Sequence, residues 1–290
     1  MTTLRREFGR LFARAKGDGA GDPWLALCRD AVKDVQAVLD GMPSRNEREP
    51  IVGEGVGGDQ TTAVDAAAEA AILTRLERLH ASHGLDFHLV SEELGERDYG
   101  VSPTRTVLVD PIDGSLNAKR NIPFFSVAIA VADGSTMADV VFGFVYDFGS
   151  GEEWTATRGG GAWLNGERLG KVRPKEQIEV LAVEATVAGA VADKAVSFAG
   201  FAHRLRIMGS LALSLCYLAA GRVDAVCSLK EARPVDIAAS QLLLREVGLP
   251  IVYADAGPFD AAPLDSAARS PVAAAGTQEL CERLAHIVAT

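Results

Sequence analysis

The sequence lacks the patterns that mark several large classes of proteins. Its four cysteines are widely spaced and form no Cys-x-x-Cys pair, and two of them lie in apolar helical patterns; they are Cys28, Cys216, Cys227 and Cys281. This usage favours buried free thiols over a disulfide framework. The five histidines show no spacing typical of a zinc site. No segment is apolar for long enough to cross a bilayer or to act as a signal sequence. We therefore expect a cytoplasmic protein.

Positive charge is also scarce. The chain has 29 Lys and Arg against 39 Asp and Glu, which gives a net charge of -10. Broad binding to nucleic acid or to an anionic membrane depends on basic side chains that neutralise phosphates, so neither partner is expected. An anionic substrate would need help from a metal. The basic amphipathic segment Met1–Lys16 is an exception, and we expect a short helix docked on its own domain there.

Common nucleotide and serine-hydrolase motifs are missing. The glycine-rich run Gly53–Gly58 has no strand before it and no helix directly after it, as a dinucleotide-binding turn would require. Neither a phosphate-binding Gly-x-x-x-x-Gly-Lys loop nor a Gly-x-Ser-x-Gly elbow occurs. We interpret the run as part of a loop that extends through residue 60.

The chain has enough apolar residues for a substantial core. It has 290 residues, of which 48% are hydrophobic, so either one large domain or two ordinary ones can form. Apolar spacing predicts helices after Asp22 and from Thr62 to about His80, followed by a strand-rich middle. From about residue 178, strands alternate with helices. The polar stretch Lys171–Gln177 is our boundary between an α+β domain at 1–175 and an α/β domain at 176–290.

The most informative stretch is Asp110-Pro-Ile-Asp113-Gly-Ser115, which follows the apolar strand pattern Thr106–Val109. Asp110 and Asp113 can converge across this turn, with the carbonyl of Ile112 between them, and such hard oxygen ligands suit one or two Mg²⁺ ions. Gly114 and Ser115 then offer backbone N–H groups and a hydroxyl to a phosphate at a predicted helix start.

Several other polar residues adjoin predicted strand or helix ends. Glu92 ends a second apolar strand, which makes an ordinary turn a poor explanation for the Asp110–Ser115 motif. Asp236 begins a helix, where simple capping is the common role of Asp, and Asp65 could be an exposed acid in the first turn of its helix. Gly209 and Ser210 either hold a substrate oxygen or cap the next helix.

Taken in order, these motifs resemble the inositol monophosphatase-like family of Mg²⁺-dependent phosphatases, which includes archaeal-type fructose-1,6-bisphosphatases. The resemblance covers about residues 23 to 285 and rests on Asp65, Ser91-Glu92-Glu93, the Asp110–Ser115 motif, Arg158–Gly166, Gly209-Ser210 and Val235-Asp236-Ile-Ala-Ala. It implies a layered αβαβα sandwich of α+β and α/β parts, with two or three Mg²⁺ per site and a homodimer.

The resemblance also implies a role for each residue. Glu92, Asp110 and the Ile112 carbonyl would bind one metal, and Asp110, Asp113 and Asp236 would bind another. Asp65 would help to hold an additional metal or its water. Ser115 would polarise the attacking water with Glu92 nearby. The expected reaction is metal-assisted, in-line hydrolysis of a phosphate ester without a covalent enzyme intermediate.

Departures from the family pattern bear on the substrate. Ser115 stands where Thr is usual and Val235 where Trp is common, while Ser228–Arg233 lacks the acid that inositol-specific members place there. Lys230 and Arg233 could bind a second phosphate or be solvated surface charges. We therefore expect a small phosphorylated metabolite as substrate, foremost fructose 1,6-bisphosphate, with possible inositol-1-phosphatase activity. The alternatives are a 3′-phosphoadenosine-type nucleotide phosphatase and a non-catalytic regulator that binds metal and phosphate.

Overall fold

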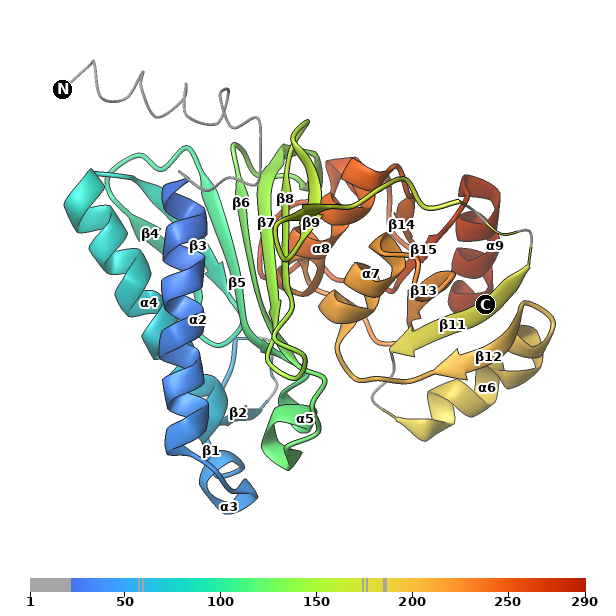
Figure 1. Ribbon diagram of the computed structural model, residues 1–290, viewed down its shortest axis with the longest axis horizontal. Coiled ribbons are helices and arrows are strands. Elements are labelled where there is room, and N and C mark those ends of the chain that lie inside the picture. The colour runs from blue at the N-terminus through green and yellow to red at the C-terminus, as the bar shows by residue number, and fades with distance from the viewer. Residues whose placement is uncertain (1–21, 57, 59, 174, 176, 185–186) are drawn as a thin grey trace.

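The computed structural model describes residues 22–56, 58, 60–173, 175, 177–184 and 187–290. These residues form five layers in the order helices, sheet, helices, sheet, helices (Figure 1). This arrangement confirms the predicted αβαβα sandwich. The segment Met1–Lys16, for which a docked helix was predicted, lies outside the described residues.

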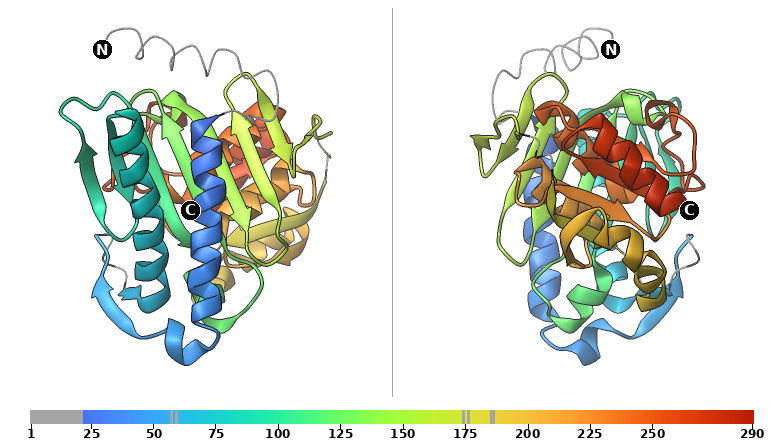
Figure 2. Two further views of the ribbon diagram at one scale, coloured as in Figure 1. Left: turned by 60° about the vertical axis from the view of Figure 1, so that its left-hand side comes forward. Right: turned by 90° about the vertical axis from the view of Figure 1, so that its right-hand side faces the viewer.

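Two long helices form the first layer. Helix α2 (Pro23–Gly41) begins as predicted, because Asp22 accepts a hydrogen bond from the backbone N of Trp24 at 2.9 Å and Pro23 occupies the first helical position. Helix α4 (Ala63–His83) lies beside it (Figure 2). Both helices pack apolar side chains on one face of the first sheet, in a core that includes Trp24, Ile72 and Phe87.

The first sheet has eight strands in the order β10-β9-β8-β7-β6-β5-β3-β4. Only the β3/β5 pair in this sheet is parallel. The strand bounds are β3 Phe87–Ser91, β4 Gly95–Tyr99, β5 Thr106–Asp113, β6 Ser126–Ala132, β7 Val140–Asp147, β8 Glu153–Thr157, β9 Gly161–Leu164 and β10 Glu167–Arg168, and the short helix α5 (Ser115–Arg120) follows β5. The carboxyl ends of β3 and β5 therefore meet at one edge of the sheet.

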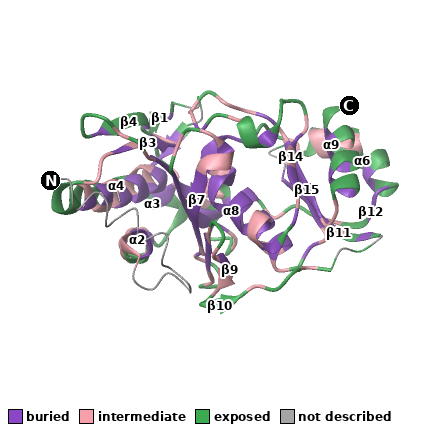
Figure 3. Ribbon diagram, turned by 90° about the horizontal axis from the view of Figure 1, so that it is seen from above, coloured by how far each residue is buried: buried purple, intermediate pink, exposed green. Residues whose placement is uncertain are grey.

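The central helices α7 (Leu211–Ala219) and α8 (Pro234–Val247) are apolar on nearly every side, as expected for helices buried between two sheets. The second sheet has the order β12-β11-β13-β15-β14, with bounds β11 Ile178–Glu184, β12 Ala202–Arg206, β13 Ala225–Ser228, β14 Ile251–Tyr253 and β15 Val272–Ala275. Helices α6 (Ala188–Ala199) and α9 (Gln278–Ala289) belong to the last layer (Figure 3). Short 3₁₀ helices occur at Met137–Asp139 and Phe259–Ala261.

Some local predictions were wrong. The region that was interpreted as a loop through residue 60 contains helix α3 (Arg45–Arg48) and a hairpin of β1 (Ile51–Glu54) and β2 (Gln60–Thr62). Strands β4, β13 and β15 and helices α6 and α9 of the last layer were not predicted. All four cysteines are buried and free, as expected. Among the described residues, no helix is both long enough and apolar enough to cross a membrane.

The predicted domain boundary falls between the two sheets, since β10 ends at Arg168 and β11 begins at Ile178. One apolar core nevertheless joins side chains from both sides of that boundary, for example Leu108 with Leu213 and Leu243. The division into two domains stays a prediction.

Candidate active site

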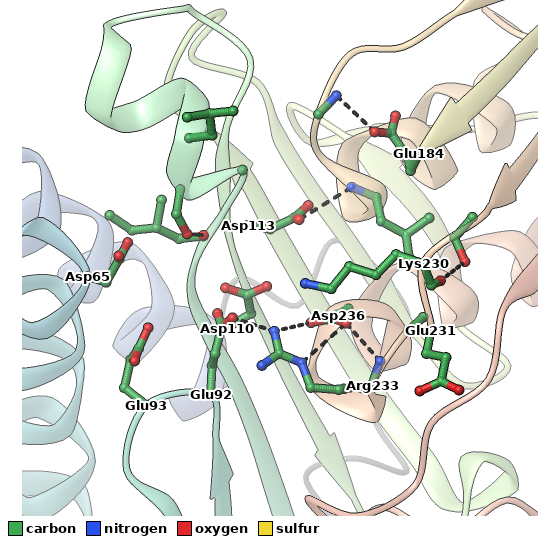
Figure 4. Close-up of a pocket in the computed structure, with 18 of the residues that line it drawn as sticks. Asp65, Glu92, Glu93, Asp110, Asp113, Glu184, Lys230, Glu231, Arg233 and Asp236 are labelled. Atoms are coloured by element: carbon green, nitrogen blue, oxygen red, sulfur yellow. Dashed lines mark hydrogen bonds and ion pairs between the residues drawn. The ribbon is translucent and has the colours of Figure 1, made fainter. Parts of the chain in front are cut away.

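A cavity of about 530 Å³ opens between the two halves of the chain. It lies at the carboxyl ends of strands β3 and β5 on one side and β11 and β13 on the other, together with the first turns of α5, α7 and α8 (Figure 4). Its size is within the range of small-molecule sites. The lining includes every residue predicted from the sequence except Ser210: Asp65, Glu92, Asp110, Ile112, Asp113, Gly114, Ser115, Gly209, Lys230, Arg233 and Asp236.

An irregularity in strand β5 brings the first two carboxylates together. Asp110 pairs with Ala128 and Asp113 with Ser126, so the register shifts between them. In a regular strand, residues three apart point to opposite faces, and one extra residue reverses that alternation. Both aspartates consequently reach the same cavity. Asp110 is 2% exposed, and burial, reinforced by repulsion from Glu92, raises the pKa of its carboxyl well above the ordinary value.

Asp113 is held by the start of helix α7. Its carboxylate accepts hydrogen bonds from the hydroxyl of Ser210, from the backbone N of Ala212 at 2.8 Å and from that of Leu211 at 3.3 Å. These contacts join strand β5 to a helix almost one hundred positions later in the chain. Burial raises the pKa of Asp113 to about 7, although the hydrogen bond from Ser210 opposes the change. Ser210 is thus placed behind the cavity, where it orients Asp113.

Glu92 and Asp236 face each other across the guanidinium of Arg233 (Figure 4). Arg233 Nη2 donates to both carboxylates, at 3.0 Å to Asp236 Oδ1, and the backbone N of Arg233 donates to Asp236 Oδ2 at 2.7 Å. The sequence had suggested that Asp236 could simply cap helix α8. The helix begins at Pro234, so Asp236 is its third residue and not its cap. Burial raises the pKa of Glu92, whereas Arg233 lowers it.

Asp65 is not the exposed acid that its position in the sequence allowed. It is 3% exposed, and its Oδ2 accepts hydrogen bonds from Thr62 N at 3.2 Å and from Thr62 Oγ1 at 2.5 Å. Burial raises the pKa of Asp65, while contacts with Thr62 and Ser115 act in the opposite direction. The hydroxyl of Ser115 donates to the Ile112 carbonyl at 3.0 Å. Asp65, Ser115 and Ile112 therefore lie together on the side of the cavity formed by the N-terminal half.

Two glycines let the halves of the cavity approach each other closely. Gly114 has φ +95 and Gly209 has φ +93, and a Cβ atom on Gly114 would lie 2.9 Å from the carbonyl oxygen of Gly209. Beside them, Asn117 Nδ2 donates to the carbonyl of Met208 at 2.7 Å. Both predicted substrate-binding glycines thus occupy backbone conformations that other residues rarely adopt.

Sequence reasoning missed four charged residues of the lining: Lys119, Glu93, Glu184 and Glu231. Glu184 ends strand β11, where an apolar run followed by an acid was a usable signal, and Lys119 lies one helical turn after Ser115. Glu231 stands within Ser228–Arg233, the stretch that was described as lacking the acid that inositol-specific members place there. Burial raises the pKa values of Glu184 and Glu93 to about 7. Lys230 extends into the cavity between Asp113 and Arg233 (Figure 4).

The donor set fits a divalent cation. The described lining contains eight acidic residues against three basic ones, an excess of five negative charges if all are ionised. Oxygen Oδ1 of Asp110 and Oδ1 of Asp65 are buried without a hydrogen-bond partner, which is costly unless a cation or water binds them. No three His, Cys, Asp or Glu side chains of the described part converge on one point as they stand, and the Arg233 guanidinium lies between Glu92 and Asp236.

Known proteins resemble this chain in sequence. Residues 24–290 match the model of the inositol monophosphatase family. The chain is 33% identical, over 90% of its length and 95% of the relative's, to a fructose-1,6-bisphosphatase/inositol-1-monophosphatase of Methanothermobacter thermautotrophicus. It is 35% identical, over 66% of its length and 70% of the relative's, to the Nus factor SuhB of Escherichia coli.

The fold is similar as well. A crystal structure of an inositol monophosphatase–fructose 1,6 bisphosphatase aligns with a TM-score of 0.77 at 27% identity, over 91% of this chain and 99% of that one. A protein of Pyrococcus horikoshii with similarities to inositol-1 monophosphatase aligns with a TM-score of 0.73 at 28% identity, over 90% and 96%. Members of the family are metal-dependent phosphatases, typically with Mg²⁺, that act on small phosphorylated metabolites. This chain is a phosphatase that belongs to the inositol monophosphatase family.

Proposed function

We propose that the protein hydrolyses phosphate monoesters of small sugars with the help of Mg²⁺, foremost fructose 1,6-bisphosphate, and that inositol 1-phosphate is a further substrate. The observation that carries this proposal is that Glu92, Asp110, Asp113 and Asp236 all line one cavity, which Ser115 also lines. A cavity with five excess negative charges would repel a phosphate dianion, so it needs bound cations before it can receive one.

The ligands proposed for the cations come from both halves of the chain. Glu92, Asp110 and the carbonyl of Ile112 would hold one ion, and Asp110, Asp113 and Asp236 would hold another. Asp65, with its buried oxygen that lacks a hydrogen-bond partner, would hold a third ion or its water. The chemistry that bound Mg²⁺ supplies here is polarisation of the phosphate oxygens and a lowered pKa of water.

The chain's own groups would position the reactants. Gly114 and Ser115 line the cavity, and their backbone N–H groups would receive phosphate oxygens, while the Ser115 hydroxyl and Glu92 would orient the attacking water. The water oxygen forms a bond to phosphorus as the bond from phosphorus to the ester oxygen breaks. The alcohol that leaves takes up a proton, and inorganic phosphate is released.

The preference for a sugar bisphosphate depends on Lys230. This residue is exposed at the cavity and directed into it, so its ammonium group would meet a second phosphate on the sugar. Gly209 belongs to the same wall and would contact the sugar. Glu231 is also exposed there and would accept hydrogen bonds from sugar hydroxyls.

A substrate panel tests this proposal. Phosphate release would be measured with Mg²⁺ from fructose 1,6-bisphosphate, inositol 1-phosphate and 3′-phosphoadenosine 5′-phosphate at equal concentrations. We expect the largest kcat/KM for the bisphosphorylated sugar. A preference for the nucleotide would instead identify the protein as a 3′-phosphoadenosine-type nucleotide phosphatase. No phosphate release from any substrate would reject the phosphatase proposal.

A second candidate is a non-catalytic regulator that binds metal and phosphate. Similarity to a relative that is named a Nus factor favours keeping this candidate. A regulator would bind inorganic phosphate in the presence of Mg²⁺ without turnover of any ester. Calorimetry and the substrate panel together distinguish this behaviour from catalysis.

The homodimer, the cytoplasmic location and the presence of two or three Mg²⁺ per site stay predictions.

A further inference from the structure

Arg233 makes an unusual set of contacts for a residue that was predicted to meet a substrate. A single guanidinium nitrogen, Nη2, donates to Glu92 Oε1 and to Asp236 Oδ1, and Nε lies 3.5 Å from Asp236 Oδ2. Glu92 follows strand β3 of the first sheet, and Asp236 belongs to helix α8. Arg233 therefore connects acids from two separate layers of the fold.

The burial of this ion pair needs an explanation other than stability. The Arg233 side chain is 7% exposed, and both of its partners are 13% exposed. Buried ion pairs are rarely more stable than apolar residues of similar size, because both charges lose their hydration. A fixed positive charge also repels a divalent cation at the same acids. The position of Arg233 is therefore explained more directly by an effect on how Glu92 and Asp236 bind a cation than by stabilisation of the fold.

We propose that Arg233 is an internal counter-cation, which holds Glu92 and Asp236 together in the metal-free protein and weakens their affinity for Mg²⁺. This inference rests on the proposed metal-dependent function and deepens it. The guanidinium stabilises the metal-free protein because its positive charge offsets the repulsion between the two acids. It stabilises the loaded protein less, because Mg²⁺ then neutralises the same acids and is repelled by the guanidinium.

A quantitative consequence follows from linkage. A group that stabilises the metal-free state more than the loaded state lowers metal affinity by the corresponding factor, and its removal must raise that affinity. The backbone bond from Arg233 N to Asp236 Oδ2, at 2.7 Å, does not depend on the side chain. A neutral side chain at position 233 can therefore remove the guanidinium while the start of helix α8 stays fixed.

The test uses Arg233→Met in the full chain. Mg²⁺ binding would be measured by isothermal titration calorimetry, and Tm would be measured in EDTA and in saturating Mg²⁺. We expect at least a tenfold lower Kd for Mg²⁺, a lower Tm in EDTA, and a larger increase of Tm on addition of Mg²⁺ than in the parent. If Arg233→Met is recovered unfolded, Arg233→Gln provides the same readouts with a neutral side chain that still donates hydrogen bonds.

The matched control is Arg222→Met. Arg222 is likewise an ion-paired arginine, with two contacts to Glu152 at 2.6 Å, but it does not line the cavity. Its replacement should lower Tm by the same amount in EDTA and in Mg²⁺, with an unchanged Kd. An equal or higher Kd for Mg²⁺ in the Arg233 variants would overturn the inference.

The inference and the proposed function can fail separately. If the parent binds Mg²⁺ but hydrolyses no ester, the phosphatase proposal fails, while the affinity comparison at position 233 still decides the role of the arginine. If the parent hydrolyses sugar phosphates and Arg233→Met binds Mg²⁺ no more tightly, only the counter-cation role fails.

Discussion

The close approach of Gly114 to Gly209 provides a direct test of how the site is assembled. Replacement of Gly114 by Ala places a Cβ atom 2.9 Å from the Gly209 carbonyl oxygen and 3.2 Å from that of Phe124. Both neighbours are backbone atoms, so neither can be relieved by a rotamer change. The backbone φ of +95 adds strain for any residue with a side chain.

The magnitude can be estimated by comparison with Gly84, the cap of helix α4. Gly84 has φ +62, and a Cβ atom there would meet nothing within 4 Å. Gly84→Ala should therefore cost only the left-handed strain, about 1 kcal/mol. Gly114→Ala carries a similar strain together with about 2 kcal/mol for the forced separation of the backbones. The separation also moves Asp113 relative to helix α7, and a displacement near 1 Å lowers kcat by about a hundredfold.

Chemical denaturation of both variants measures the free energy of unfolding, and phosphate release with Mg²⁺ measures activity. We expect a loss of about 3 kcal/mol of stability and most of the activity for Gly114→Ala. Gly84→Ala should lose about 1 kcal/mol and retain parental activity. Equal losses of stability in the two variants, or full activity of Gly114→Ala, would refute the close contact between the two halves.

Three other predictions concern the acids and their cations. Asp113→Asn should reduce kcat by at least about a hundredfold because it removes a proposed ligand, and turnover near the parental level would reject that assignment. Removal of Mg²⁺ with EDTA should abolish phosphate release without unfolding the protein, as followed by circular dichroism, and added Mg²⁺ should restore activity. Glu184, whose pKa is raised to about 7 by burial, binds a proton more readily in the folded protein. The metal-free parent should therefore lose stability as pH rises from 4.5 through 7, and this group contributes at most about 3 kcal/mol to the loss. Denaturant titrations from pH 5 to 8 should show a smaller decline in the free energy of unfolding for Glu184→Gln than for the parent.

Features that depend on neighbouring residues were predictable from the sequence. The helix start at Asp22–Pro23 and the turn after strand β5 use side chains whose effects act over only a few positions. The Asp110–Ser115 motif, together with Glu92 at the end of a second strand, therefore indicates where the cavity lies. Strands β13 and β15 were missed because each has only four residues and β15 is rich in Ala, so burial between helices stabilises them more than intrinsic preference does.

Contacts between distant segments were not predictable. The register of strand β5 changes after Asp110, and the start of helix α7 then reaches Asp113. Neither the bulge nor the packing of α7 is encoded by spacing within one short motif. The burial of Asp65 likewise depends on how helix α4 lies against the sheet, so its first-turn position alone could not distinguish an exposed acid from a buried one.

The two basic residues that were grouped from the sequence have different surroundings, and this difference changes the basis for substrate choice. Arg233 is buried and its guanidinium is directed at Glu92 and Asp236, whereas Lys230 is exposed and extends into the cavity. A second phosphate on the substrate could reach Lys230 from the cavity, but it would have to compete with two acids for Arg233. Preference for a bisphosphate over a monophosphate should consequently depend on Lys230, and metal affinity should depend on Arg233.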